Sequence, residues 1–241
     1  MGAQHARHVG GSGWRMIDGS EIVAVVHRYV ERYPDERGHL RPLLDQLDAG
    51  LPITDRSAYP GHLTCSALVV DDEGRTLRIW HNVFRKWLQP GGHLESTDAS
   101  LVGAALRELA EETGVILDVT TVLGGDTGDT SDTSEWRHPL DIDVHAIPAN
   151  RYKRESKHYH FDLRYAFRLP AAADVTLQWE EVSGFQWTPI GEITSPRIAD
   201  KLNRSLREHL PTRTRTASAQ PPMPRDRGRI GQARDLVDDD A

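Results

Sequence analysis

The stretch from Pro90 to Val115 constrains the fold of this chain more than any other segment. Turn-forming residues, among them Gly91 and Gly92, stand directly before a run with helical apolar spacing that starts at Thr97 or Asp98. The run continues to Thr113, and Gly114 follows at the place where a left-handed residue ends a helix. The segment therefore predicts a loop that leads into a helix.

Three glutamates crowd one face of this predicted helix. Glu108, Glu111 and Glu112 are separated by three and four positions, which are neighbouring positions on a helix surface. Like charges at this spacing, close to the negative end of the helix dipole, cost a few tenths of a kcal/mol each. A hard divalent cation such as Mg²⁺ or Mn²⁺ would offset that cost, because carboxylate oxygens are its preferred ligands. The alternative interpretation is an acidic face in contact with water.

The same segment resembles the Nudix box. That pattern is a glycine, five residues, a glutamate, seven residues, and then Arg-Glu-apolar-x-Glu-Glu-x-Gly-apolar. The second half is matched at every position by Arg107 to Val115. In the first half, counted from Gly92, Asp98 stands at the glutamate position, and eight residues separate it from Arg107. The start, Gly91-Gly92-x-x-Glu95, is also similar to the family.

The resemblance covers roughly residues 60 to 210 and implies a fold and a reaction. The implied fold is α/β or α+β, an α/β/α sandwich with a mixed β-sheet, to which this chain adds an N-terminal helical hairpin. The implied reaction is hydrolysis of a nucleoside diphosphate linked to another group X, which gives a nucleoside monophosphate and phospho-X. The cofactor would be Mg²⁺ or Mn²⁺.

The resemblance also implies roles for individual residues. Arg107 resembles the residue that pairs with Glu95 to orient the box, and Gly91 and Gly114 resemble its structural glycines. Either Glu111 or Glu112 resembles the family's base, which activates the attacking water. The expected catalytic residues are therefore Arg107, Glu111 and Glu112. The implied metal ligands are the carboxylates of Glu108, Glu111 and Glu112 and the carbonyl of Gly92.

The rest of the chain divides by composition and periodicity. Residues 1–19 predict a flexible arm, residues 20–50 a helical hairpin packed on the core, and residues 51–210 the Nudix domain. Within them, helices are expected from Ser20 to Pro34, from Gly38 to Leu47 and from Glu192 to Leu210, and strands at His62 to Val70 and Arg75 to Phe84. Residues 211–241 predict a disordered tail.

A second group of polar residues suggests substrate contacts. His158, His160 and Asp162 alternate along a predicted strand, so they share one face. Three ligands from one strand do not easily close around one ion, so we expect these residues to line the site and keep zinc as an alternative. The expected substrate-binding set is His93, His158, His160, Asp162 and Arg164, and the alternative for each is ordinary solvated surface.

The net charge and the cysteine content limit which binding partners and which cellular compartment are expected. The formal charge of −7 disfavours nonspecific binding to nucleic acid or to an anionic membrane. Cys65 is the single cysteine, which is typical of a reducing, cytoplasmic compartment, and no membrane span is expected. A homodimer through the helical hairpin is left open.

Three functions are consistent with these features. The first is a metal-dependent pyrophosphohydrolase acting on a nucleotide or related diphosphate. The second is a non-catalytic, nucleotide-binding sensor built on a Nudix-like domain, and the third is a zinc enzyme centred on the histidines. The nucleobase and the X group are not encoded in the box, so the helical hairpin and residues 124–138 are the expected selectors.

Overall fold

The computed structural model describes residues 17–123, 138–151, 154–169 and 175–209. Most of the predicted arm, the predicted tail and nearly all of the expected selector segment lie outside these residues. In the described part, the helices are α1 (Gly19–Arg32), α2 (Arg41–Asp48), α3 (Leu101–Thr113) and α4 (Pro196–His209), with short 3₁₀ turns η1 (Pro34–Glu36), η2 (Val119–Thr121) and η3 (Ile190–Glu192). The strands are β1 (Gly61–Asp71), β2 (Arg75–His81), β3 (Lys86–Leu88), β4 (Gly91–His93), β5 (Val122–Leu123), β6 (Asp141–Ile147), β7 (His158–Leu169) and β8 (Val182–Pro189).

The starts of α1 and α3 differ from the sequence prediction. Helix α1 is capped by the Asp18 side chain, which accepts from the Ser20 amide, so it begins one residue before Ser20. Helix α3 begins at Leu101 because the Ser100 hydroxyl accepts the Gly103 amide at 3.1 Å. The expected start at Thr97 or Asp98 is wrong, since those residues belong to the preceding turn. The end of α3 is as predicted, with Gly114 in the left-handed region at φ 67°.

The second and last helices also have shifted bounds. Helix α2 starts at Arg41, with Pro42 in its first turn, and not at Gly38. Helix α4 starts at Pro196, because Glu192 belongs to the separate turn η3. The strand expected to run to Phe84 ends at His81, where a turn leads to β3.

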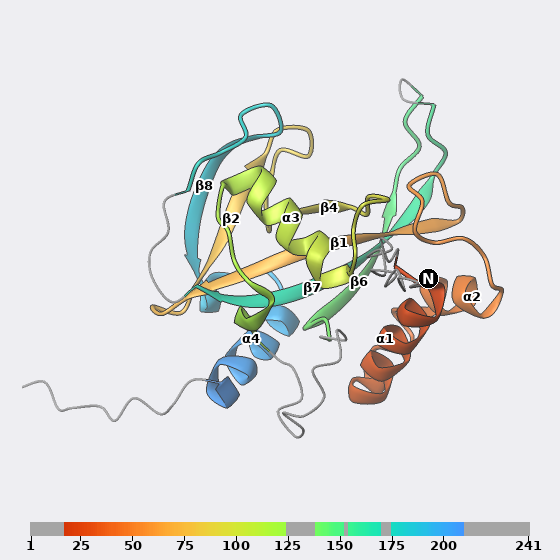
Figure 1. Ribbon diagram of the computed structural model, residues 1–241, viewed down its shortest axis with the longest axis horizontal. Coiled ribbons are helices and arrows are strands. Elements are labelled where there is room, and N and C mark those ends of the chain that lie inside the picture. The colour runs from red at the N-terminus through yellow and green to blue at the C-terminus, as the bar shows by residue number, and fades with distance from the viewer. Residues whose placement is uncertain (1–16, 124–137, 152–153, 170–174, 210–241) are drawn as a thin grey trace, which may run out of the picture. The chain divides into compact units, whose positions relative to one another are not determined.

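The strands form one mixed sheet (Figure 1). Its main order is β3-β2-β1-β7-β5, with β4 beside β1, β6 beside β7 and β8 beside β2. Strands β1 and β7 run parallel, from Gly61 opposite Tyr159 to Asp71 opposite Leu169, and every other pair is antiparallel. The two long parallel strands are therefore the centre on which the other elements are arranged.

Helices cover both faces of this sheet, as expected for an α/β/α sandwich. Side chains on one face of β1, such as Leu63 and Val69, pack in a core with residues of α1, α2 and α3. On the other face, Leu68 and Val70 pack with Ile198 and Leu202 of α4. Figure 1 shows α3 lying obliquely across the central strands. The second face becomes polar toward the start of β1, and this polar part leads to the candidate site.

The helices of the described part include none that is long and apolar enough to cross a membrane.

Candidate functional site

The two glycines of β4 bring the loop against helix α3. Gly91 donates its amide to Glu112 Oε2 at 2.9 Å. A Cβ built on Gly92 would lie 2.5 Å from Glu108 Oε1, and a Cβ on Gly91 would lie 2.5 Å from Ser66 Oγ. Only glycine fits these positions without displacement, so the backbone of β4 and two glutamates are held in direct contact.

The three glutamates of α3 have different environments. Glu108 and Glu112 are largely buried, whereas the Glu111 side chain is 54% exposed. Burial raises the pKa of Glu108 to about 7, although the Arg107 guanidinium opposes the rise. Burial also raises the pKa of Glu112 to about 8, and its carboxylate neighbours add to the rise. Two of the three predicted carboxylates are therefore poorly solvated and in need of positive charge.

Arg107 holds this group together through several hydrogen bonds. Its Nε and Nη2 donate to the two carboxylate oxygens of Asp98 at 2.9 and 3.1 Å, and its Nη1 donates to Glu108 at 3.0 Å and to Glu111 at 2.9 Å. Its Nη2 also donates to the His93 carbonyl at 2.9 Å. The guanidinium thus connects α3, the turn before it and the end of β4.

The expected pairing of Arg107 with Glu95 is present as a long ion pair, but Asp98 is the closer carboxylate partner of the guanidinium. Glu95 Oε1 lies 3.9 Å from Arg107 Nη1 and its side chain is 57% exposed, whereas the Asp98 side chain is 5% exposed. Asp98 also accepts the Glu95 amide at 2.7 Å. The extra residue before Arg107 is accommodated in this turn, which places Asp98 closer to the guanidinium than Glu95.

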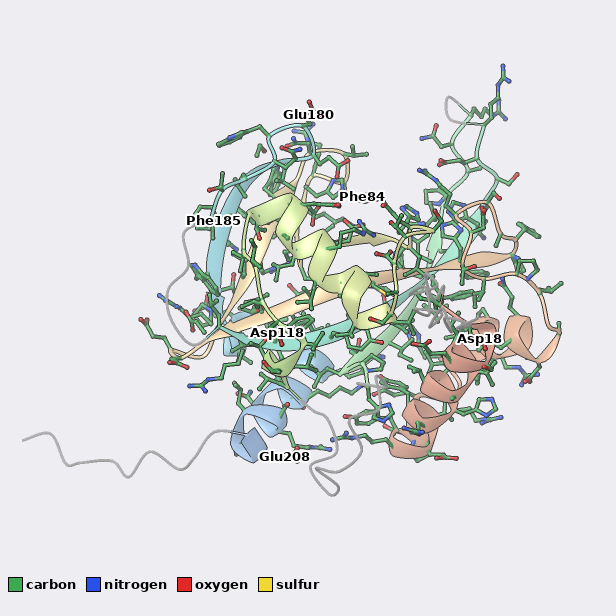
Figure 2. All side chains as sticks on the ribbon, in the orientation of Figure 1. Asp18, Phe84, Asp118, Glu180, Phe185 and Glu208 are labelled. Carbon is green, nitrogen blue, oxygen red and sulfur yellow. The ribbon has the colours of Figure 1, made fainter. Side chains whose placement is uncertain are left out.

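Glu181 is a further acid that the sequence did not single out. It immediately precedes β8, and its charge contributes to the raised pKa of both Glu108 and Glu112. Its carbonyl accepts the Asn82 amide at 2.9 Å, which joins the turn before β8 to the turn after β2. Figure 2 shows Glu180 and the exposed Phe84 on these two turns. No local motif marks Glu181, because only the pairing of β2 with β8 brings it here.

Four histidines converge on the polar side of the sheet. His62 lies opposite His160 in the β1–β7 register, and His93 lies opposite Thr64 in the β1–β4 register. The rings of His93 and His158 are centred 5.1 and 4.9 Å from that of His62. His62 was missed by the sequence prediction, although its alternation with Thr64 and Ser66 is a signal that could have found it.

Three of these imidazoles, those of His62, His93 and His160, favour the neutral form. Burial, with help from neighbouring imidazoles, lowers the pKa of His93 to about 4 and that of His160 to about 3. The pKa of His62 is lowered by the same two causes. At neutral pH, these three imidazoles therefore offer nitrogen lone pairs and N–H donors without positive charge.

The histidines lie at a cavity of about 1140 Å³. Cationic and aromatic side chains share its wall with them, namely Arg56, Arg151, Arg154, Tyr59 and Phe84. His93, His158 and His160 of the expected substrate-binding set thus line one cavity. Because His93 belongs to β4, the cavity adjoins the glycine loop.

Asp162 and Arg164, the other two members of that set, lie away from this cavity. Arg164 forms ion pairs with Asp141, Asp143 and Asp162 at 2.9–3.2 Å. Asp162 additionally accepts from Ser66 Oγ at 2.6 Å. Strand β6 places two aspartates opposite β7, so these groups bind one another, and we do not propose substrate contact for them.

Comparison with known proteins identifies the family. The sequence matches the model of the NUDIX domain over residues 60–210. The chain belongs to the Nudix family. The Nudix match begins just before β1, so α1 and α2 precede it, while their apolar side chains pack in the same core as β1 and β7.

Curated relatives of this Nudix chain match it over short stretches. A probable DHNTP pyrophosphohydrolase from Lactococcus lactis is 32% identical over 107 residues, which are 44% of this chain and 54% of the relative. The phosphatase NudJ of Escherichia coli K12 is 50% identical over 59 residues, 24% of this chain and 37% of the relative. The chain thus spans about half or less of the curated relatives that it matches.

Solved structures of Nudix proteins are more distant in sequence. A Nudix hydrolase from Clostridium perfringens is 19% identical with a TM-score of 0.44, and the match covers 61% of this chain and 97% of that one.

Proposed function

We propose that this Nudix domain is a divalent-metal-dependent pyrophosphohydrolase. Its substrate would be a nucleoside diphosphate linked to another group X, or a related diphosphate, and its products a nucleoside monophosphate and phospho-X. The observation that supports this most is the contact of Glu108 and Glu112 with the glycines of β4, maintained by Arg107.

The residues of the box fit a hard divalent cation. We propose that Mg²⁺ or Mn²⁺ is held by the carboxylates of Glu108, Glu111 and Glu112 and by the Gly92 carbonyl. All of these donors are oxygens, as such cations require, and burial raises the pKa values of Glu108 and Glu112, so a bound cation would stabilise their charged forms. When bound, the cation supplies neutralisation of the negative charge on the phosphates.

The chain's own residues would position this chemistry. Arg107 fixes the His93 carbonyl and Glu108 relative to each other, and the Gly91 amide orients Glu112. Either Glu111 or Glu112 would accept the proton of the attacking water. Glu111 is exposed and accepts a hydrogen bond from Arg107 on one carboxylate oxygen, whereas Glu112 is buried with a pKa of about 8. A pH–rate profile of each glutamine variant separates these two assignments.

The cavity beside β4 is the proposed binding place for the rest of the substrate. Arg56, Arg151 and Arg154 supply positive charge for phosphate groups, and the rings of Tyr59 and Phe84 offer flat apolar surface to a base. His93 would lie between the two regions, because its carbonyl is held by Arg107 and its ring lines the cavity.

Phosphate release from a substrate panel tests the proposal. The panel contains nucleoside triphosphates, nucleotide sugars, ADP-ribose, dinucleoside polyphosphates and, because a relative's name points to it, dihydroneopterin triphosphate. It is assayed with Mg²⁺, with Mn²⁺ and with a chelator, using a coupled phosphatase where needed. Glu112→Gln keeps an oxygen acceptor for the Gly91 amide, and exposed Glu192→Gln serves as its matched control.

We expect metal-dependent turnover that Glu112→Gln lowers by roughly 100-fold or more and that Glu192→Gln leaves unchanged. Turnover that is equal with metal and with chelator would contradict the proposal. Retained nucleotide binding without turnover on any compound would favour the sensor function instead.

A further inference from the structure

We propose that His62, His158 and His160 form a second metal site, which takes Zn²⁺ or another transition-metal ion of similar ligand preference. One ring nitrogen from each residue can be chosen so that all three lie within 4.8 Å of one another. The three come from two parallel strands, since His62 belongs to β1 and the other two to β7. This removes the objection that ligands from one strand cannot close around an ion. Imidazole nitrogens suit zinc, copper or nickel and not Mg²⁺, so this site differs in chemistry from the box.

The distance between two of the ligands matches tetrahedral coordination. Zn–N bonds of about 2.0–2.1 Å at tetrahedral angles place ligand nitrogens roughly 3.3 Å apart. The Nε2 atoms of His158 and His160 are 3.3 Å apart and form a hydrogen bond, which an ion bound between them would replace. One nitrogen of His62 belongs to the set whose members all lie within 4.8 Å of one another, so movement of the imidazole rings toward a common centre would complete the coordination.

A backbone contact orients His158 for this role. His158 Nδ1 lies 2.8 Å from the Ser156 carbonyl, which can only accept a hydrogen bond, so Nδ1 carries the proton. In the neutral ring, this leaves a lone pair on Nε2, the atom directed at His160. A carbonyl on the second ring nitrogen is the usual means by which proteins orient a metal-binding histidine.

His62 has an unsatisfied side chain at the centre of the cluster. It is 2% exposed, and neither ring nitrogen has a partner of ordinary hydrogen-bond geometry among the described residues, although the Ala58 backbone lies close enough to affect its pKa. Leaving such a buried polar group unpaired is unfavourable. A metal ion coordinated by one of these nitrogens would satisfy it.

The surroundings of the three histidines determine which group can be the fourth ligand of the ion. Asp162, two residues beyond His160, is engaged by Ser66 and Arg164 and does not supply a ligand. Three neutral imidazoles leave the ion with its full double charge, and the open side of the cluster faces a cavity lined by Arg56, Arg151 and Arg154. An anionic group or water is therefore the expected fourth ligand. Three histidines and one open position are a ligand set found at catalytic zinc centres.

Zinc binding to the full chain tests the site. The protein is stripped with a chelator, dialysed, and titrated with Zn²⁺ against a chromogenic competitor in excess Mg²⁺, so that hard-cation sites are filled. The variants are His158→Gln and His160→Gln, with His145→Gln as the matched control, because His145 lies beside His160 but outside the triad. Zinc held by histidines elsewhere in the chain would bind equally to all of them. Absorption of the Co²⁺ form distinguishes tetrahedral nitrogen coordination from octahedral oxygen coordination.

We expect one zinc per chain at this site, with affinity about 100-fold weaker in His158→Gln and His160→Gln and unchanged in His145→Gln. The Co²⁺ form should show the intense visible bands of a tetrahedral complex. Equal zinc affinity in the His158 and His145 variants would overturn the proposal, as would the absence of zinc binding in excess Mg²⁺. Glu112→Gln should retain zinc, so the site can fail or stand independently of the proposed hydrolase, and loss of zinc in that variant would assign the ion to the box.

Discussion

Gly92 is the residue of β4 at which any side chain would collide with a glutamate of α3. We expect Gly92→Ala to weaken Mg²⁺ binding by at least tenfold, because its Cβ would lie 2.5 Å from Glu108 Oε1 and displace that carboxylate. The measurement is a Mg²⁺ titration in which the thermal unfolding temperature reports binding. Gly191→Ala is the matched control, since a Cβ there has nothing within 4 Å. Equal Mg²⁺ affinity in the two variants would show that Glu108 does not take part.

Asp98 and Glu95 allow a second test at the residue scale. Asp98→Ala removes a buried carboxylate with two hydrogen bonds from Arg107, so we expect a loss of about 3 kcal/mol in the free energy of unfolding. Glu95→Ala removes an exposed carboxylate 3.9 Å from the same guanidinium, so a loss below about 1 kcal/mol is expected. Urea unfolding compares the two variants. A larger loss in Glu95→Ala would reinstate the pairing that the family pattern implied.

Helix α3 is the element whose stability should depend on pH. The pKa values of Glu108 and Glu112 are raised from an ordinary 4.5 to about 7 and about 8. Between these limits the folded state binds more protons than the unfolded state, so the contribution of these groups is full below about pH 4.5 and is lost as the pH rises toward 8. Without divalent cation, we expect the contribution of Glu108 and Glu112 to the free energy of unfolding to fall over this range.

A double variant isolates that contribution. The lowered pKa values of His62, His93 and His160 act in the opposite direction, because they favour the folded state as the pH rises. Urea unfolding is therefore measured from pH 5 to pH 8 in the native chain and in Glu108→Gln/Glu112→Gln. The difference between the two should decrease with pH and should recover when Mg²⁺ is added. A difference that does not vary with pH would contradict the raised pKa values.

At the scale of the whole molecule, a buried ionic network joins elements from both ends of the chain. Lys201 of α4 lies 2.6 Å from Glu36 of η1 and 2.9 Å from Asp141 of β6, and it donates to the Tyr29 hydroxyl of α1 at 2.6 Å. Lys201 and both carboxylates are buried. We expect Lys201→Met to lower the free energy of unfolding by about 3–5 kcal/mol, because it leaves buried negative charge undercompensated.

The control for that prediction is an exposed pair. Arg41→Met breaks the contact of Arg41 with Asp45, whose side chains are 75% and 57% exposed, and should cost under about 1 kcal/mol. Denaturant unfolding of both variants makes the comparison. Similar losses in the two would mean that the network contributes little to holding α1 and α4 to the sheet.

The local features of this chain were predictable because short-range physics decides them. The end of α3 at Gly114 follows from a requirement for positive φ, and the grouping of Glu108, Glu111 and Glu112 follows from the helical period. The alternation of His158 and His160 likewise places them on one face of a strand. None of these depends on how distant segments meet.

Strand register and burial decided the rest. Asp98 is the buried partner of Arg107 from the turn before α3, because that turn absorbs the extra residue and buries its carboxylate. Asp162 and Arg164 belong to an internal network of ion pairs, because β6 places Asp143 and Asp141 opposite them. His62 joins the other histidines through the parallel pairing of β1 with β7, a contact between residues almost a hundred positions apart. The sequence by itself determined the box, its glycines and its helix, since these follow from residue spacing. The tertiary structure alone decided which charged side chains pair and which histidines meet, since only the sheet brings those side chains within reach of one another.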